Sequence, residues 1–371
     1  MKVGLIIYGS LDTLSGGYLY DRKLVEHLRS RGDRVEIFAL PWRDYGRHLL
    51  DNLDSALLRR ILAADLDVLI QDELNHPSLI RLNSRLKALS PLPVVALVHH
   101  LRCSEARPRW QNALYAAIER RYLHGVDAFI FNSHTTRRSV EDLTRARPCV
   151  VAHPGADRLG RADGAHVARR AHLPAPLRLL FLGNVIERKA LHTLIEAMAL
   201  PDAADWVLDV VGGLSVEPHT VAACRALIEK RRLGPRVTFH GALLDDALTP
   251  FLQRSHALAV PSTWEGFGIV YMEAAAFGLP AIAGSAGAAG EVVADGISGH
   301  LVAPHDAAAI ARHLHAWAQD RAALAQMAQA ALTRFDAHPT WAQTAEATRA
   351  FLLTLRETQT PHTRGSSGFG S

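Results

Sequence analysis

Residues 261–280 read PSTWEGFGIVYMEAAAFGLP, and this stretch decides the fold. An apolar run ends at Val260, a turn with Gly266 and Gly268 follows, and a helical pattern begins near Ile269. The first N–H groups of a helix have no acceptor within the helix, and together with the helix dipole they form an anion site. Glycine in the turn lets the backbone approach a phosphate closely. The stretch therefore predicts a strand, a glycine turn and a phosphate-binding helix start.

Two glutamates bracket this turn, Glu265 before it and Glu273 on the expected helix. Their carboxylates could reach hydroxyl groups at opposite ends of a ligand whose phosphates lie on the helix N–H groups. A nucleotide sugar is such a ligand, with a hexose at one end and a ribose at the other. An ordinary helix start with an acidic first turn would show the same residues. The stretch alone leaves both interpretations open.

Strand and helix patterns alternate on both sides of this stretch. Short apolar runs typical of buried strands lie at residues 2–8, 35–40, 68–70, 94–98, 128–131, 150–152, 177–182, 206–211, 237–239, 257–260 and 281–283. Amphipathic helical stretches separate them, and this alternation predicts an α/β fold with parallel, doubly wound sheets. A chain of 371 residues also exceeds the size that one core usually supports.

The two series of strands predict two facing Rossmann-like domains, one at residues 1–170 and one at 177–338. A last helix at 339–358 is expected to pack back toward the first domain. The Gly- and Ser-rich tail at 360–371 is typical of a disordered segment. In such folds a ligand binds at the carboxyl ends of the strands, so the junctions between strands and helices are the candidate ligand sites.

The composition is that of a soluble protein, 49% hydrophobic and 21% charged, and no apolar run is long enough to span a bilayer. The opening residues MKVGLIIYGS run into a glycine turn without a cleavage site, which favours a first strand over a signal peptide. Cys103, Cys149 and Cys224 lie far apart in the sequence and form no metal-binding or disulfide pattern. These features predict a cytoplasmic protein.

The net charge of +4 is unevenly distributed. Residues 1–170 contain 26 Lys and Arg against 19 Asp and Glu, a net charge of +7, whereas the remainder carries −3. A basic first half could attract the inner face of an anionic membrane or an acidic acceptor. It is equally compatible with a solvated, arginine-rich surface. No nucleic-acid partner is expected.

The stretch RPRWQNALYAAIERRY, residues 107–122, predicts an amphipathic helix. Trp110, Leu114, Ala117 and Ile118 share one side of it, and arginines lie near both ends. Most helices of this kind pack their apolar side against a sheet, and that is the first expectation here. The same pattern also suits a helix that lies on an anionic membrane or contacts a lipid-linked acceptor.

Five segments in sequence order resemble the family-4 glycosyltransferases of the GT-B fold. They are LSGGYLYDRKLVEHLRSRG at 14–32, HPGAD at 153–157, FLGNVIERKALHTLIEAM at 181–198, VVGG with VTFHGAL between 210 and 243, and the Glu-x7-Glu stretch continued by GEVVADGISGHLV to residue 302. The resemblance implies the GT-B architecture, in which the domain at 1–170 faces the acceptor and the domain at 177–338 binds the nucleotide sugar. It also implies retaining transfer of a hexosyl group from a nucleoside-diphosphate sugar, without a metal or other cofactor. The implied acceptor is a sugar or a lipid-linked molecule of envelope glycolipid or surface polysaccharide synthesis.

The resemblance also implies roles for individual residues. Lys189 matches the lysine that contacts the donor phosphates, Glu265 the carboxylate near the donor sugar, and His99 a histidine near the transferred sugar, so these three are the expected catalytic residues. Glu273 matches the carboxylate that binds the ribose hydroxyls. The other expected donor-binding residues are Gly16, Gly17, Arg188, Gly266, Phe267, Gly268, Ile269 and Val270. Among these, Phe267 is expected to anchor the turn by packing.

One position departs from the family pattern. Asn184 stands where an arginine is common after the glycine of the donor loop, and Arg188 could supply that charge instead. The departure keeps open a non-catalytic binding subunit. A sugar-nucleotide epimerase and a phosphorylase also have two facing Rossmann-like domains, but an epimerase lacks the Glu-x7-Glu pattern and a phosphorylase needs a pyridoxal lysine and a longer chain.

Two further patterns could be mistaken for metal sites. His99 and His100 are neighbours at a strand end, so their side chains should point to opposite faces and not converge on one ion. Asp65 and Asp67 precede the strand at 68–70 and are expected in a solvated turn. No metal site is therefore predicted.

Overall fold

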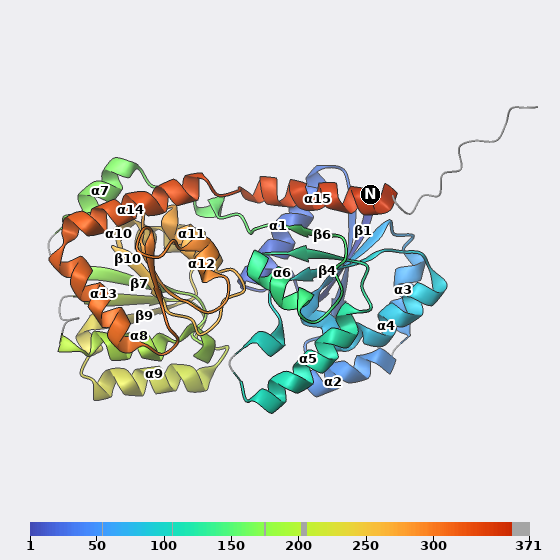
Figure 1. Ribbon diagram of the computed structural model, residues 1–371, viewed down its shortest axis with the longest axis horizontal. Coiled ribbons are helices and arrows are strands. Elements are labelled where there is room, and N and C mark those ends of the chain that lie inside the picture. The colour runs from blue at the N-terminus through green and yellow to red at the C-terminus, as the bar shows by residue number, and fades with distance from the viewer. Residues whose placement is uncertain (54, 106, 174–175, 202–205, 358–371) are drawn as a thin grey trace, which may run out of the picture.

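The computed structural model describes residues 1–371 apart from 54, 106, 174–175, 202–205 and 358–371. Two parallel six-stranded sheets, each covered by helices, lie side by side along the molecule (Figure 1). The predicted α/β fold with two facing Rossmann-like domains is confirmed. The predicted tail at 360–371 lies outside the described residues.

The first sheet has the strand order β2-β1-β3-β4-β5-β6. Successive residues of β1 face opposite sides, so that Ile6 joins the apolar layer under α3, α4 and α5, while Leu5 and Ile7 join the layer under α1 and α15. The elements of this domain are β1 (Lys2–Tyr8), α1 (Gly16–Ser30), β2 (Arg34–Leu40), α2 (Tyr45–Leu50), α3 (Ala56–Ala63), β3 (Val68–Asp72), α4 (His76–Leu89), β4 (Val94–Val98), α5 (Arg109–Leu123), β5 (Ala128–Phe131), α6 (His134–Glu141) and β6 (Cys149–Val151).

The second sheet has the order β12-β11-β10-β7-β8-β9, and all its pairings are parallel. Its strands are nearly continuous apolar runs because helices cover both faces. The elements are α7 (Gly164–Ala171), β7 (Leu177–Leu182), α8 (Leu191–Met198), β8 (Trp206–Val211), α9 (Pro218–Lys230), β9 (Val237–Gly241), α10 (Asp245–Arg254), β10 (Ala257–Val260), α11 (Ile269–Ala275), β11 (Ala281–Gly284), α12 (Ala289–Val292), β12 (Gly299–Val302), α13 (Ala307–Gln319) and α14 (Arg321–Asp336); α15 (Trp341–Glu357) follows.

The structure adds detail that the sequence patterns did not predict. Strand β12 was not expected, because GHLV is short and its two middle residues are only half-buried. Three helices, α13, α14 and α15, follow β12. Asp320 is extended and caps the start of α14, and Pro339 lies in the break before α15, where a helix could not continue.

Two segments cross between the domains. Helix α7, which the sequence division placed at the end of the first domain, packs on the second: Val167 lies in its core, and Arg170 donates hydrogen bonds to the carbonyls of Phe277 and Gly278, both at 2.8 Å. Helix α15 runs back over the first domain and packs on α1 (Figure 1). There Trp341 joins the apolar layer that contains Leu5 and Ile7.

Helix α5 does not pack as first expected. Its buried residues are Glu119, Tyr122 and Leu123, whereas Trp110 and Leu114 are 68% and 54% exposed. The expectation that the Trp110 side faces the sheet is therefore wrong, because the opposite side of the helix carries the contacts with the domain. Among the described residues, no helix is long and apolar enough to cross a membrane.

Candidate functional site

A cleft of about 600 Å³ lies between the domains, where the carboxyl ends of the two sheets face each other. The loops after β1, β4, β7 and β10 contribute to its walls. The predicted site residues that line it are His99, Lys189, Glu265, Gly16, Gly17, Arg188, Gly266, Phe267, Gly268, Ile269 and Val270. Of the predicted set, Glu273 alone lies outside this lining.

Glu265 follows β10 and is buried in the wall of the second domain. Lys189 Nζ donates to its Oε1 at 2.5 Å, Ser262 Oγ donates to the same oxygen at 2.7 Å, and Arg188 Nη1 lies 3.4 Å from Oε2. Burial acts to raise the pKa of Glu265, but the charges of Lys189 and Arg188 outweigh it and hold the pKa at about 2. Glu265 is thus a carboxylate that can accept hydrogen bonds from sugar hydroxyls.

Lys189 and Arg188 belong to a single 3-10 turn after β7, Glu187–Lys189. Arg188 Nη1 also donates to the carbonyl of Trp264 at 2.5 Å, and the Thr263 N–H donates to the carbonyl of Arg188 at 2.8 Å. The loop after β7 is thereby fastened to the loop after β10. Two basic side chains are held beside one carboxylate, next to the glycine turn.

The two glycines of the turn, Gly266 and Gly268, are required for different reasons. Gly268 has φ +91° at the start of α11, and a Cβ there would also collide with the Tyr271 ring. A Cβ on Gly266 would collide with the carbonyl of His99, so this glycine permits close contact between the two domains. Close approach of a phosphate to Gly266, which the sequence predicts, stays a prediction. Phe267 packs its ring against that of His153 at 5.4 Å.

The glycines at the start of α1 leave room for two neighbouring side chains. A Cβ on Gly17 would lie 3.2 Å from Cδ2 of His99, and one on Gly16 would lie 3.4 Å from Cδ1 of Ile269. The side chain of Ile269, the first residue of α11, therefore lies close to the start of α1 in the other domain.

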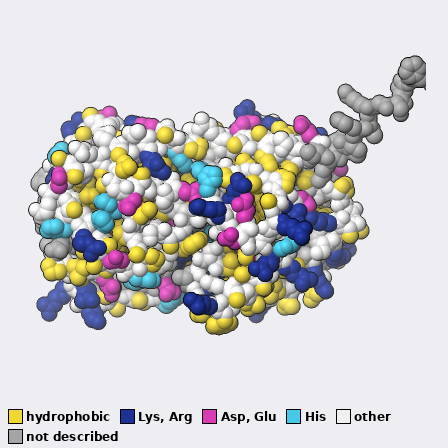
Figure 2. Space-filling model, in the orientation of Figure 1, with side chains coloured by type: hydrophobic (Ala, Val, Ile, Leu, Met, Phe, Trp, Pro, Cys, Tyr) yellow, Lys and Arg dark blue, Asp and Glu magenta, His cyan; other side chains and the backbone are white. Residues whose placement is uncertain are grey.

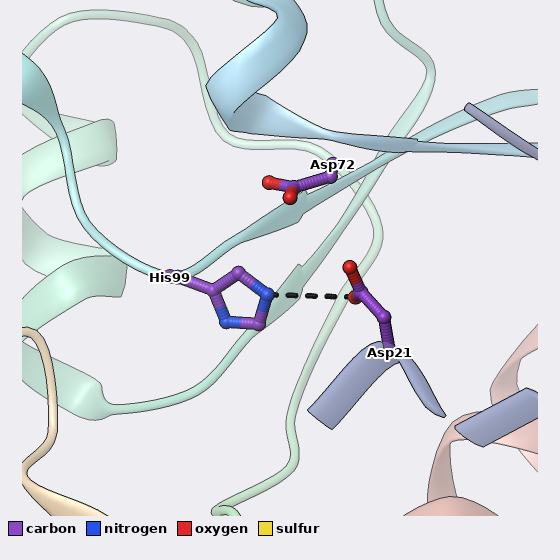
Figure 3. A group of neighbouring side chains, drawn as sticks. All are labelled: Asp21, Asp72 and His99. Carbon is purple, nitrogen blue, oxygen red and sulfur yellow. Dashed lines mark ion pairs between the residues drawn. The ribbon is translucent and has the colours of Figure 1, made fainter. Parts of the chain in front are cut away.

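His99 lies beside two carboxylates that the sequence analysis did not name, Asp21 and Asp72 (Figure 3). Its Nε2 lies 3.5 Å from Oδ1 of Asp21 on α1, and Asp72 ends the neighbouring strand β3. Burial acts to lower the pKa of His99, but Asp21 and Asp72 outweigh it and raise the pKa above its usual value. The ligand atoms of the three residues lie within 4.8 Å of one another, a spacing that could also hold a metal ion.

Glu273 is engaged away from the cleft. It is buried on α11, and its Oε1 accepts a hydrogen bond of 2.7 Å from Nε of Arg158, which also pairs with Asp245. A ribose would therefore have to share this carboxylate with an arginine. The ribose role of Glu273 stays a prediction.

The remaining sequence expectations concern Asn184 and the apparent metal motifs. Asn184 Oδ1 accepts a hydrogen bond of 3.1 Å from the Gly213 N–H, which joins the loops after β7 and β8. His100 contacts Glu105 at 3.0 Å, away from the Asp21 carboxylate that contacts His99. Asp65 pairs with Lys2 at 2.5 Å on the surface.

A further residue that sequence reasoning missed joins the two domains. Glu291 of α12 accepts hydrogen bonds from the N–H groups of His134 and Thr135, at 2.9 and 2.7 Å, and thus caps the first turn of α6 in the other domain. Burial acts to raise the pKa of Glu291, but His153, whose Nε2 lies 3.5 Å from Oε2, and the hydrogen bonds from Thr135 and His134 lower the pKa to about 2. This cap and the contact at Gly266 therefore join the two domains.

Comparisons with known proteins agree with this architecture. Residues 19–158 match the model described as Glycosyltransferase Family 4, and residues 168–334 match the model described as Glycosyl transferases group 1. The D-inositol 3-phosphate glycosyltransferase of Streptomyces avermitilis is 36% identical over 195 residues, which are 49% of this chain and 41% of that protein. The Mycobacterium avium protein of the same name is 32% identical over 267 residues, 68% of this chain and 60% of that protein. The chain thus spans about half the length of these curated relatives.

Solved structures with the same fold cover nearly the whole chain. Sucrose-phosphate synthase from Thermosynechococcus elongatus superposes with a TM-score of 0.81 at 21% identity, over 96% of this chain and 100% of that one. HepE from Anabaena in complex with UDP-glucose superposes with a TM-score of 0.73 at 19% identity, over 96% of this chain and 100% of that one. At these identities the likeness shows a common fold.

Proposed function

We propose that this chain, a protein of the group 1 and family-4 glycosyltransferase type, transfers a hexosyl group from a nucleoside-diphosphate sugar to an acceptor hydroxyl with retention of configuration. The observation that carries the proposal is the pairing of Glu265 with Lys189 and Arg188 beside the glycine turn. A carboxylate that could bind the hexose hydroxyls and two cations that could bind the diphosphate are thereby held side by side. The complex of HepE with UDP-glucose supports this class of donor for the fold.

In the proposed reaction the bond between the anomeric carbon and the diphosphate oxygen breaks, and the acceptor oxygen bonds to the same face of that carbon. The leaving diphosphate gains negative charge, and Lys189, Arg188 and the N–H groups of Ile269 and Val270 would stabilise it. The acceptor's proton would pass to the leaving phosphate. Because these protein groups supply the positive charge, the proposal requires no metal ion.

Glu265 and His99 would orient the hexose from opposite walls of the cleft. The contacts that join the domains, among them the Glu291 cap on α6, would limit the access of water to the donor and so limit hydrolysis. A non-catalytic binding subunit and an epimerase are the alternatives. Neither requires a basic pair and a histidine on opposite walls of one cleft.

A panel of nucleotide sugars tests this proposal. A donor that binds the folded protein should raise its melting temperature, because ligand that binds only the native state stabilises it. The stabilising donor should then be consumed with release of the nucleoside diphosphate, and NMR of the product should show the donor's anomeric configuration. Stabilisation without turnover on any acceptor would favour a binding subunit, and an inverted product would overturn retention.

We further propose that the enzyme works at an anionic membrane surface on envelope or surface-polysaccharide acceptors. The supporting observation is α5, whose Trp110 and Leu114 are exposed between Arg109 at one end and Arg120 and Arg121 at the other. Lys and Arg side chains also gather over the first domain, on the right of Figure 2.

A further inference from the structure

The cleft continues past His99 into the first domain, beyond the part that would hold the donor. This extension is lined by Trp42, Tyr45, Asp72, Glu73 and Arg102, among others. Its residues come from the ends of β2 and β3 and from the loop after β4. Under the proposed function the extension is where an acceptor would lie, so the nature of its walls bears on the class of acceptor.

An aromatic face is open to this part of the cleft. Trp42 lines it with 53% of its surface exposed, and its ring lies 5.2 Å from that of Tyr8. Tyr8 in turn stacks on His48 with ring centroids 4.0 Å apart, so Trp42 rests on a packed aromatic layer. An indole fixed at the wall of a polar cleft offers an apolar surface to the face of a sugar ring.

Two carboxylates with unused acceptor capacity lie near it. Asp72 and Glu73 are both 3% exposed and line the cleft. Oε1 of Glu73 makes no hydrogen bond: His76 Nδ1 lies 3.0 Å away, but it donates to the Glu73 carbonyl. Burial raises the pKa of Asp72 and of Glu73 to about 7 in each case. A ligand hydroxyl that donates to Glu73 would satisfy an oxygen that is otherwise costly to bury.

The basic groups of this region differ in how far they are neutralised. Arg43 pairs with Asp51 at 2.5 Å. The guanidinium of Arg102 lies over the rings of Tyr45 and Tyr115, at 5.1 and 4.8 Å, and its Nε makes no hydrogen bond among the described residues. Burial lowers the pKa of His76 to about 4, so its imidazole is neutral at pH 7.

A phosphate here would lie beside Asp72 and Glu73, and these carboxylates repel an anion when they are ionised, which they increasingly are above pH 7. The cleft is thus divided by charge: its second-domain wall carries Lys189 and Arg188 for a diphosphate, and its first-domain extension is acidic and aromatic.

We infer that the acceptor is an unphosphorylated sugar or glycoside whose ring packs on Trp42 and whose hydroxyls donate to Asp72 and Glu73. This inference rests on the proposed function. It distinguishes the chain from the curated relatives whose names specify D-inositol 3-phosphate.

Paired acceptors test the inference. The enzyme, with the donor found in the thermal-shift panel, is given glucose and glucose 6-phosphate, inositol and inositol 3-phosphate, and a series of methyl glycosides. Unphosphorylated members should show kcat/KM at least about tenfold above their phosphorylated partners. Saturation-transfer NMR with the nucleoside diphosphate present measures acceptor binding without turnover. Preference for the phosphorylated partner, or absence of binding by every unphosphorylated sugar, would overturn the inference.

Variants locate the site. Trp42→Ala should raise the acceptor KM about tenfold or more, with a smaller effect on kcat, because it removes ring contact and no charge. Glu73→Gln should raise the same KM and retain the shape of the pocket. Leu89→Ala, at an exposed hydrophobic position at the end of α4, is the matched control and should leave the acceptor KM unchanged. An unchanged acceptor KM in Trp42→Ala would contradict the inferred location.

Donor binding and slow donor hydrolysis, measured without an acceptor, separate the two proposals. If neither occurs with any nucleotide sugar, the proposed function fails. If both occur and phosphorylated acceptors are preferred, the acceptor inference alone fails.

Discussion

Nε2 of His99 lies 3.5 Å from Oδ1 of Asp21, and no hydrogen bond from another group reaches either Asp21 oxygen among the described residues. His99 is almost enclosed, so its charge depends on its neighbours: Asp21 from α1, Asp72 from β3 and Glu73 from the turn that follows β3. These carboxylates favour the imidazolium over the neutral ring. Under the proposed function Asp21 is therefore a positioning residue, which would act on the transferred sugar through His99.

Asp21→Asn should lower the pKa of His99, because the amide keeps the shape of the side chain and removes its charge. A group whose pKa is raised by folding stabilises the folded state at pH values below its pKa in the unfolded chain. This contribution is lost as pH rises through its pKa in the folded state. Where kcat/KM depends on the imidazolium of His99, its decrease on the alkaline side should begin at lower pH. NMR titration of the His99 ring measures the shift directly. Asp12→Asn, at an exposed acid of the same domain, is the control. An unmoved His99 titration would remove Asp21 from this role.

The fold could be predicted because its signal is local. Each buried strand is a short apolar run, each helix has an amphipathic pattern, and their alternation implies parallel sheets. The glycine turn and the basic residues of the donor loop were also recognisable, since each lies within one short segment. Helix α5 shows the limit: the pattern identifies an apolar side, but only the packing of the domain shows that Trp110 faces outward.

The carboxylates around His99 could not be predicted in the same way. Asp21, Asp72 and His99 meet only because β3 and β4 are neighbours and α1 packs beside them. Asp72 stands at the carboxyl end of a strand, where ligand sites gather, and that position was the one available signal. Asp21 lies within a helix and carried none.

Lys189→Ala should lower turnover by about two to three orders of magnitude, as loss of other preorganised charge stabilisers does. The change also leaves Glu265 without its nearest cation, so the free energy of unfolding should fall, although Arg188 and Ser262 remain beside it. Thermal melting therefore accompanies the kinetics, and Lys230→Ala on the exposed end of α9 serves as control. Near-normal turnover in a folded Lys189→Ala protein would mean that another group neutralises the diphosphate.

Glu273→Gln should weaken donor binding by about tenfold to a hundredfold if the carboxylate binds the ribose, since hydrogen bonds to charged groups contribute roughly 1.5–3 kcal/mol. Loss of the ion pair with Arg158 should also lower the melting temperature. Calorimetric titration with the donor separates the two effects. Glu196→Gln, at an exposed position on α8, is the matched control. A donor affinity equal to that of the control would confine Glu273 to its pairing with Arg158.

Treatment with EDTA should leave transfer activity intact, because in the proposed mechanism Lys189 and Arg188 supply the charge that the leaving diphosphate needs. The cluster of Asp21, Asp72 and His99 gives this test a definite alternative, since its ligand atoms are close enough to hold an ion. Activity is compared before and after chelation and after return of Mg²⁺, Mn²⁺ or Zn²⁺. A loss of activity that an added metal reverses would contradict the prediction. If the added metal does not restore activity in Asp72→Asn, the ion binds at this cluster.

The outward face of α5 should bind anionic membranes. Burial of a large apolar side chain contributes up to about 1.5–3 kcal/mol, and the arginines near its ends add an attraction that salt screens over ~8 Å at physiological ionic strength. The protein should therefore cosediment with phosphatidylglycerol vesicles at low salt, less as salt rises, and less with phosphatidylcholine. A double change of Trp110 and Leu114 to serine should lower the bound fraction about tenfold, because both side chains are exposed and contribute little to the fold. Leu244→Ser, at a similarly exposed leucine of the second domain, should bind like the unchanged protein. If the unchanged protein stays in the supernatant at low salt, α5 is not a membrane surface, and the acceptor is then to be sought among soluble sugars.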